Sequence, residues 1–155
     1  MPRIQLKGLD DTVFVLNRLT DKSEGVIKRA IYDGAGILAD AVRANIDTIK
    51  TGGPSDWERR RRETQKAGLR AGLTTFDIKE KGGTIEGGVG FDGYNELGQA
   101  NRMIARVFNS GTSFSSRQPF FERAIRSARY AARQKVLSEI EDELSLIHIS
   151  EPTRH

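Results

Sequence analysis

The 155-residue sequence contains no cysteine, and its only two histidines, His148 and His155, lie at the very end of the chain. Without cysteine, no disulfide, thiolate nucleophile or thiolate metal ligand can form. Histidine is the side chain best suited to proton transfer at neutral pH and is the commonest metal ligand. Residues 1–143 lack both residue types, so we expect a protein that is not an enzyme and has no metal site and no cofactor.

Long apolar runs are also absent. The nearly apolar stretch over residues 35–41 is interrupted by Gly36 and Asp40, whereas a membrane-spanning helix needs about 20 apolar residues. The first residues carry a charge at Arg3 with no apolar segment behind it, which argues against a signal peptide. We therefore expect no membrane contact and assembly in the cytoplasm.

The charge balance is mild, with 25 basic and 21 acidic residues and a net charge of +4. Such a balance permits contact with nucleic acid without requiring it. Hydrophobic residues make up 37% of a chain whose length suits one domain.

Residues 144–155 are expected to be foreign to the native protein. Leu144 to Arg154 reads as the in-frame translation of a transposase adapter that is used to prepare sequencing libraries, and His155 fits a codon that starts with the next adapter base. The alternative is a natural amphipathic extension. We predict a native single domain over residues 1–143 and exclude the segment 144–155 from the fold prediction.

Hydrophobic spacing predicts three helices. Asp10 and Asp11 suit the start of a short helix over residues 10–20. A longer helix is expected over residues 22–48, and a third should begin near Pro119. Acidic residues within 139–143 oppose the dipole at the end of the third helix, which predicts fraying. The apolar stripe of the second helix is Ile27, Ile31, Ala35, Leu38, Val42, Ile46 and Ile49, and that of the third is Phe121, Ile125, Ala128, Ala132, Val136 and Ile140.

A small antiparallel sheet is predicted between these helices. Residues 73–79 read as a strand, Lys81-Gly82-Gly83 as a hairpin turn, and residues 85–91 as the alternating return strand. Residues 103–109 are too few for periodicity to separate strand from helix. The pattern predicts an α+β fold, with N-terminal helices and a long C-terminal helix packed on a small antiparallel sheet.

Three glycines, Gly88, Gly90 and Gly93, have the spacing of a dinucleotide-binding loop. That loop must open a helix within a strand–helix–strand unit. Because no long amphipathic helix starts at Tyr94, we interpret them as strand glycines.

The run Arg59–Arg62 lies in an arm over residues 52–67, which is expected to be flexible or a short helix. It can contact nucleic-acid phosphates, pair with acidic residues of a neighbouring subunit or remain solvated. Glu58 and Glu63 flank the run and soften its field. Trp57 is an aromatic residue of the kind that anchors interfaces, which favours the subunit contact over nucleic acid.

Two segments resemble the tail-completion, or head–tail joining, proteins of long-tailed bacteriophages. The first is Gly90-Phe91-Asp92-Gly93-Tyr94-Asn95. The second spans residues 97–124, where Ser110-Gly111-Thr112-Ser113 is followed by Gln118-Pro119-Phe120-Phe121 before an amphipathic helix. In that family an N-terminal helix leads to a Thr-Gly element and a Leu-Arg strand. Here Thr51-Gly52 and Gly68-Leu69-Arg70 correspond in order, with the arm between them.

The resemblance implies a structural virion protein of the head–tail neck, encoded by a phage or prophage and assembled in the host cytoplasm. It implies a ring around the DNA channel, with further copies of the chain and other neck or tail proteins as partners. DNA would pass through the lumen without sequence readout. The alternative is a prophage-encoded nucleic-acid-binding module that uses Arg59–Arg62 and the last helix.

A ring of identical subunits needs two different contact faces. We expect the arm, at residues 57–66, and the loop 110–118 to supply them. Gly111 can adopt a turn conformation, Thr112 or Ser113 can bond to the backbone there, and Phe121 is expected in the core. The candidate contact residues are Trp57, Arg59, Arg60, Arg61, Arg62, Ser110, Gly111, Thr112, Ser113 and Phe120.

Overall fold

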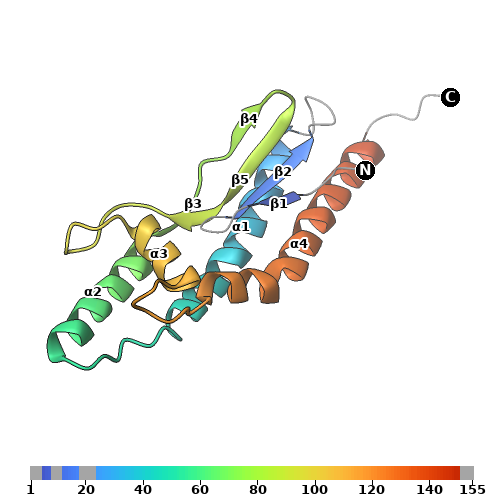
Figure 1. The fold of residues 1–155 in the computed structure, drawn as a ribbon. Helices are drawn as coiled ribbons and strands as arrows, with labels where there is room; N and C mark the ends of the chain where they lie inside the picture. Colours follow the sequence, from blue (N-terminus) through green and yellow to red (C-terminus); the bar gives the residue numbers. More distant parts are fainter. Residues whose placement is uncertain (1–4, 8–11, 18–23, 151–155) are drawn as a thin grey trace.

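The computed structural model describes residues 5–7, 12–17 and 24–150. Helix α1 (Glu24–Ile46) packs on an antiparallel sheet, and helix α4 (Phe120–Ser150) runs beside α1 in the opposite direction (Figure 1). Helices α2 (Asp56–Gly72) and α3 (Asn101–Ser110) lie together at one end of this body. The predicted α+β fold with a long C-terminal helix is confirmed.

The sheet is centred on its longest strand, β5 (Thr84–Phe91). On one side β5 pairs with β2 (Thr12–Asn17), which in turn pairs with β1 (Gln5–Lys7). On the other side, the first residues of β5 pair with β4 (Lys79–Lys81) and its last residues pair with β3 (Leu73–Thr75). All of these pairings are antiparallel. The predicted hairpin turn is confirmed, because Gly82 and Gly83 both have positive φ, which glycine adopts without strain.

Two predictions about the strands were wrong. Residues 12–17 form strand β2 and not part of a helix, because Thr-Val-Phe-Val-Leu is rich in β-branched and aromatic residues that suit a strand. The cap and the ends of that predicted helix lie outside the described residues. The predicted strand over 73–79 is split into β3 and β4. Residues 76–78 separate them, and Phe76 N still donates to Gly88 O over 2.8 Å.

Helix α1 confirms the longest predicted stripe. All seven residues of the predicted stripe are buried, including Ile49, which lies just beyond the end of the helix. The predicted start at Lys22 lies outside the described residues. The helix approaches the sheet closely at Gly87, where a Cβ atom would come within 2.6 Å of Ile31 Cγ2. Glycine in the strand thus lets α1 lie directly on β5.

Helix α2 resolves the arm as an ordered helix. Ser55 caps it, since its side chain accepts a hydrogen bond from Glu58 N, and Ser55-x-x-Glu58 has the spacing of a capping box. Leu69 is the only buried residue of α2. Leu69 and Arg70 were expected in a strand by the family resemblance. They belong to α2 instead, and the strand starts at Leu73.

The residues that the sequence left undecided, 103–109, form part of α3. Helix α4 starts one residue after Pro119, and its predicted stripe faces the interior. The expected fraying near residue 143 was wrong, because α4 continues to Ser150 through a segment rich in leucine and isoleucine, residues compatible with a helix. Within the described residues, no helix is both long and apolar enough to cross a membrane.

Three aromatic rings form the centre of the core at the α2–α3 end. The ring centroid of Phe91 lies 6.0 Å from that of Phe120 and 6.0 Å from that of Phe121. The centroids of Phe120 and Phe121 are 6.4 Å apart, and each pair of ring planes is steeply inclined. Tilted and edge-to-face pairs of this kind stabilise a core beyond the area they bury. They join the end of β5 to the start of α4.

A glycine seam positions α2. A Cβ atom at Gly68 would lie 2.6 Å from Asn95 Cβ, and one at Gly72 would lie 2.5 Å from Asp92 O and from Asn101 Nδ2. The two glycines are four residues apart and share one helix face. The loop after β5 can therefore lie directly on the backbone of α2.

We expect Gly72→Ala to destabilise the fold by about 1–3 kcal/mol, because the added methyl group meets backbone that cannot move freely. The matched control is Gly36→Ala in α1, where a Cβ atom meets nothing within 4 Å. That change should raise stability by about 1 kcal/mol through helix propensity. Urea unfolding of both variants measures the difference, and equal stabilisation by both would contradict the seam.

Candidate functional site

The candidate site is a groove at the α2–α3 end, which we call the α2–turn groove. Its volume is about 350 Å³, and it lies between α2, α3 and the turn at residues 112–115. The residues that line it are Trp57, Glu58, Arg61, Arg62, Gln65, Val107, Phe108, Thr112, Phe114 and Ser115. The arm and the loop were predicted separately as contact segments, and the structure brings them together in this groove.

The turn at residues 112–115 is tightly held. Thr112 N donates to Ser115 O over 2.9 Å, and Phe114 N donates to Thr112 Oγ1 over 3.2 Å, as expected for a threonine that bonds to the backbone. Gly111 precedes the turn with φ of 75°, and a Cβ atom there would come within 2.9 Å of Arg117 N. The turn presents Phe114 at its tip, 96% exposed.

The rest of the loop is fastened to two helices. The side-chain amide of Gln118 donates to Lys50 O over 3.1 Å and accepts from Lys50 N over 2.8 Å. Asn109 is buried, and its Oδ1 accepts from Glu122 N in the first turn of α4. All three hydrogen bonds satisfy backbone groups that would otherwise be unpaired. The groove wall is therefore built on the ends of α1 and α4.

The arginine run divides into different roles. Arg59 Nη1 donates to Gly53 O over 2.9 Å, Arg62 donates to Gly52 O, and Arg59 also pairs with Asp56. These two guanidinium groups hold the loop before α2 against the helix. Arg61 lies over the ring of Trp57, with 5.4 Å from Cζ to the ring centroid, which is a cation–π geometry. Arg60 is exposed.

Helix α2 is also bound to the end of α1. Lys66 Nζ donates to Asp47 O and Ile49 O over 3.1 and 3.0 Å. These carbonyls follow the last turn of α1, where a cation is favoured by the helix dipole. Arg70 forms an exposed ion pair with Asp47, which contributes little by itself.

The predicted contact residues differ in how exposed they are. Trp57 is 66% exposed, and Ser110, Thr112 and Ser113 are exposed, while Gly111 is half-buried. Phe120 was wrongly included, because it is fully buried in the aromatic core and has no surface to offer a neighbour.

Phe114 was missed by the sequence prediction. Its signal was available, since it is the only large apolar residue between Gly111 and Pro119. The expectation that the arm and the loop lie on two different faces was also wrong. Both segments line one groove, so a ring would need its second contact face elsewhere.

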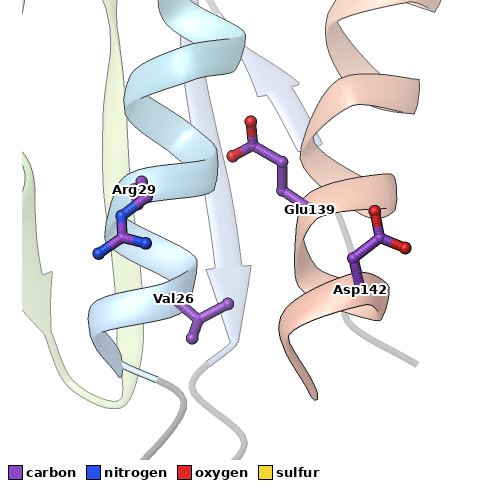
Figure 2. Close-up of a pocket in the computed structure, with 4 residues that line it drawn as sticks. All are labelled: Val26, Arg29, Glu139 and Asp142. Carbon is purple, nitrogen blue, oxygen red and sulfur yellow. The ribbon is translucent and has the colours of Figure 1, made fainter. Parts of the chain in front are cut away.

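A second, smaller hollow lies between α1 and α4. It is lined by Val26, Arg29, Glu139 and Asp142 and has a volume of about 190 Å³. Glu139 points from α4 toward α1 (Figure 2). Burial raises the pKa of the Glu139 carboxyl group, and a hydrogen bond with the Asp33 carboxyl raises it further. The nearby Lys135 partly opposes this increase in pKa.

The two hollows differ in chemistry. The neighbouring carboxyl groups of Glu139 and Asp33 can make stability depend on pH. Among the described residues, no three or more acidic, histidine or cysteine side chains are grouped as metal ligands. The α2–turn groove instead combines exposed aromatic rings with arginine, a composition typical of protein contacts.

Comparisons with known proteins add nothing to this geometry. No protein-family model, no curated protein and no solved structure matches the chain.

We expect Glu139→Gln to flatten the dependence of stability on pH. A raised pKa means that the folded state holds the proton more tightly than the unfolded chain does. The stabilisation from this group is therefore complete at acid pH and is lost as the pH rises through the folded-state pKa. The neutral glutamine removes that loss, so the melting temperature of the variant should exceed that of the wild type at neutral pH.

Thermal unfolding between acid and neutral pH measures this effect. The control is Glu141→Gln, because Glu141 lies on the same helix and is exposed. If Glu139→Gln and the control follow the same profile, the raised pKa of Glu139 does not contribute to stability.

Proposed function

We propose that this chain is a structural protein of the bacteriophage head–tail neck that completes or joins the tail by forming a ring of identical subunits around the DNA channel. The observation that carries the proposal is the α2–turn groove. The charge pattern singled out α2 and the family resemblance singled out the 110–118 loop, and the two segments line the same groove. Exposed aromatic side chains beside a groove mark a surface built for contact.

We infer that the occupant of the groove is a second copy of this chain. Arg61 and Arg62 outnumber the single acid of the groove, Glu58. The exposed acids Glu141 and Asp142 lie in the C-terminal half of α4 and match this positive charge. Electrostatic complementarity of this kind steers partners together and selects their orientation.

The positions of the two surfaces favour association from head to tail. The groove lies at the α2 end of the molecule and the acidic end of α4 lies at the opposite end (Figure 1). A contact between two different surfaces is heterologous, and such contacts close into rings when the rotation between neighbours allows it. One groove and one acidic segment of α4 per chain are the two faces that a ring requires.

The alternative is a nucleic-acid-binding module that uses Arg59–Arg62 and the last helix, and its first element, the arginine run, has less support. Arg59 and Arg62 are bonded to loop carbonyls and Arg61 stacks on Trp57. The run therefore offers phosphates fewer available cations than its sequence suggests.

We expect wild-type chain to associate as its concentration rises, and Trp57→Ala or Phe114→Ala to weaken that association. An aromatic hot spot contributes about 2 kcal/mol, which corresponds to a roughly 30-fold higher dissociation constant. Sedimentation velocity measures the constants, and negative-stain imaging tests whether the oligomers are rings. Tyr32→Ala is the control, because Tyr32 is 62% exposed on α1 and does not line the groove.

A charge exchange identifies the occupant. Arg61→Glu and Glu141→Lys should each reduce association, and the double variant should recover part of it if the two side chains meet across the contact. If the wild-type chain stays monomeric at every soluble concentration, the proposed self-association is wrong. Aromatic variants that associate as strongly as the wild type would place the contact elsewhere.

A further inference from the structure

Helix α4 carries a second charged surface that the groove does not involve. Residues 123–138 contain five basic residues and no aspartate or glutamate. Four of the five are arginines, at positions 123, 126, 129 and 133, and all four are exposed. We call Arg123, Arg126, Arg129 and Arg133 the arginine stripe.

Spacing places the arginine stripe on one side of the helix. Intervals of three and four residues bring side chains onto the same face, and the stripe extends about 15 Å along the axis at 1.5 Å per residue. The apolar stripe that packs against α1 occupies a different side, with Ala132 and Val136 fully buried. The guanidinium groups therefore face solvent along one side of the helix.

The charge of the arginine stripe is not neutralised by any side chain that the structure describes. No ion pair or hydrogen bond reaches any of its four guanidinium groups from the side chains that the structure describes, at residues 24–80 and 82–142. The long basic side chains of α2 behave differently, since Arg59, Lys66 and Arg70 all have partners. An array of unpaired like charges costs energy through repulsion, and a polyanion removes that cost.

We propose that the arginine stripe binds the phosphodiester backbone of duplex DNA without reading its sequence. Arginine presents a planar fork that matches phosphate oxygens, which lysine does not. No asparagine or glutamine lies between residues 123 and 133, so the stripe lacks the amide side chains that read adenine edges, and an exposed row of guanidinium groups suits phosphate oxygens. Tyr130 is 73% exposed within the stripe and adds a hydroxyl group that can donate to a phosphate.

This inference deepens the proposed function, because DNA is the polyanion that a neck ring encloses, but its test does not need the ring. It also confines the DNA contact to the outer face of α4, whereas the alternative nucleic-acid-binding module uses the arginine run of α2 as well. A groove variant such as Trp57→Ala leaves the arginine stripe intact, so loss of assembly and loss of DNA binding are separate results.

Fluorescence anisotropy with two labelled duplexes of unrelated sequence tests the proposal on the full chain. The wild type should bind both equally, with affinity that falls steeply between about 50 and 200 mM salt. The variant R126Q/R129Q/R133Q should lose affinity, and its salt slope should drop by about 0.9 for each phosphate contact removed. Glutamine is a good helix former and these sites are exposed, so circular dichroism should show an unchanged fold.

The matched control is R60Q, which removes an exposed arginine of α2 that does not line the groove and should leave the salt slope nearly unchanged. If this control abolishes binding and the α4 variant does not, the DNA contact belongs to α2. A wild-type chain that does not bind either duplex at low salt overturns the proposal. Equal binding of polyglutamate, lost in the same α4 variant, would assign the stripe to an acidic protein instead.

Discussion

The close approach of α2 to the loop after β5 is the constraint on which the candidate site depends. Helix α2 is almost entirely polar and buries only Leu69, so hydrophobic burial alone holds it weakly. Gly68 and Gly72 let the backbone of the loop lie against the helix, where any larger residue would meet Asn95 or Asp92. Without that contact, one wall of the α2–turn groove would have no fixed position.

Buried polar side chains make the same region rigid. Asn95 Oδ1 accepts from Leu97 N and Gln99 N, and Gln99 Oε1 accepts from Gln65 on α2 and from the Asn95 amide. A satisfied network of this kind specifies one arrangement, since each broken bond would leave a buried polar group unpaired. The groove is thus held by hydrogen bonds and glycine contacts, while the α1–α4 pair is held by apolar packing.

The mild net charge of +4 conceals three different uses of arginine. Arg59 and Arg62 stabilise a loop, Arg61 covers an aromatic ring, and the arginine stripe on α4 has no partner among the described residues. Local environment, and not the total charge, therefore decides which cations are available to an external partner. This division explains why the densest run of arginine in the sequence is not the surface that we assign to DNA.

The sequence by itself determined the fold class, the long helix α1, the hairpin at Gly82–Gly83 and the apolar face of α4, because periodicity and turn chemistry are local properties. It misjudged β2, since Val13 and Leu16 fit either a helix or a strand and only pairing with β5 decides. Tertiary structure alone brought α2 and the 112–115 turn into one groove and buried Phe120. Contacts between residues 50 positions apart depend on how the chain folds back, which no local pattern encodes.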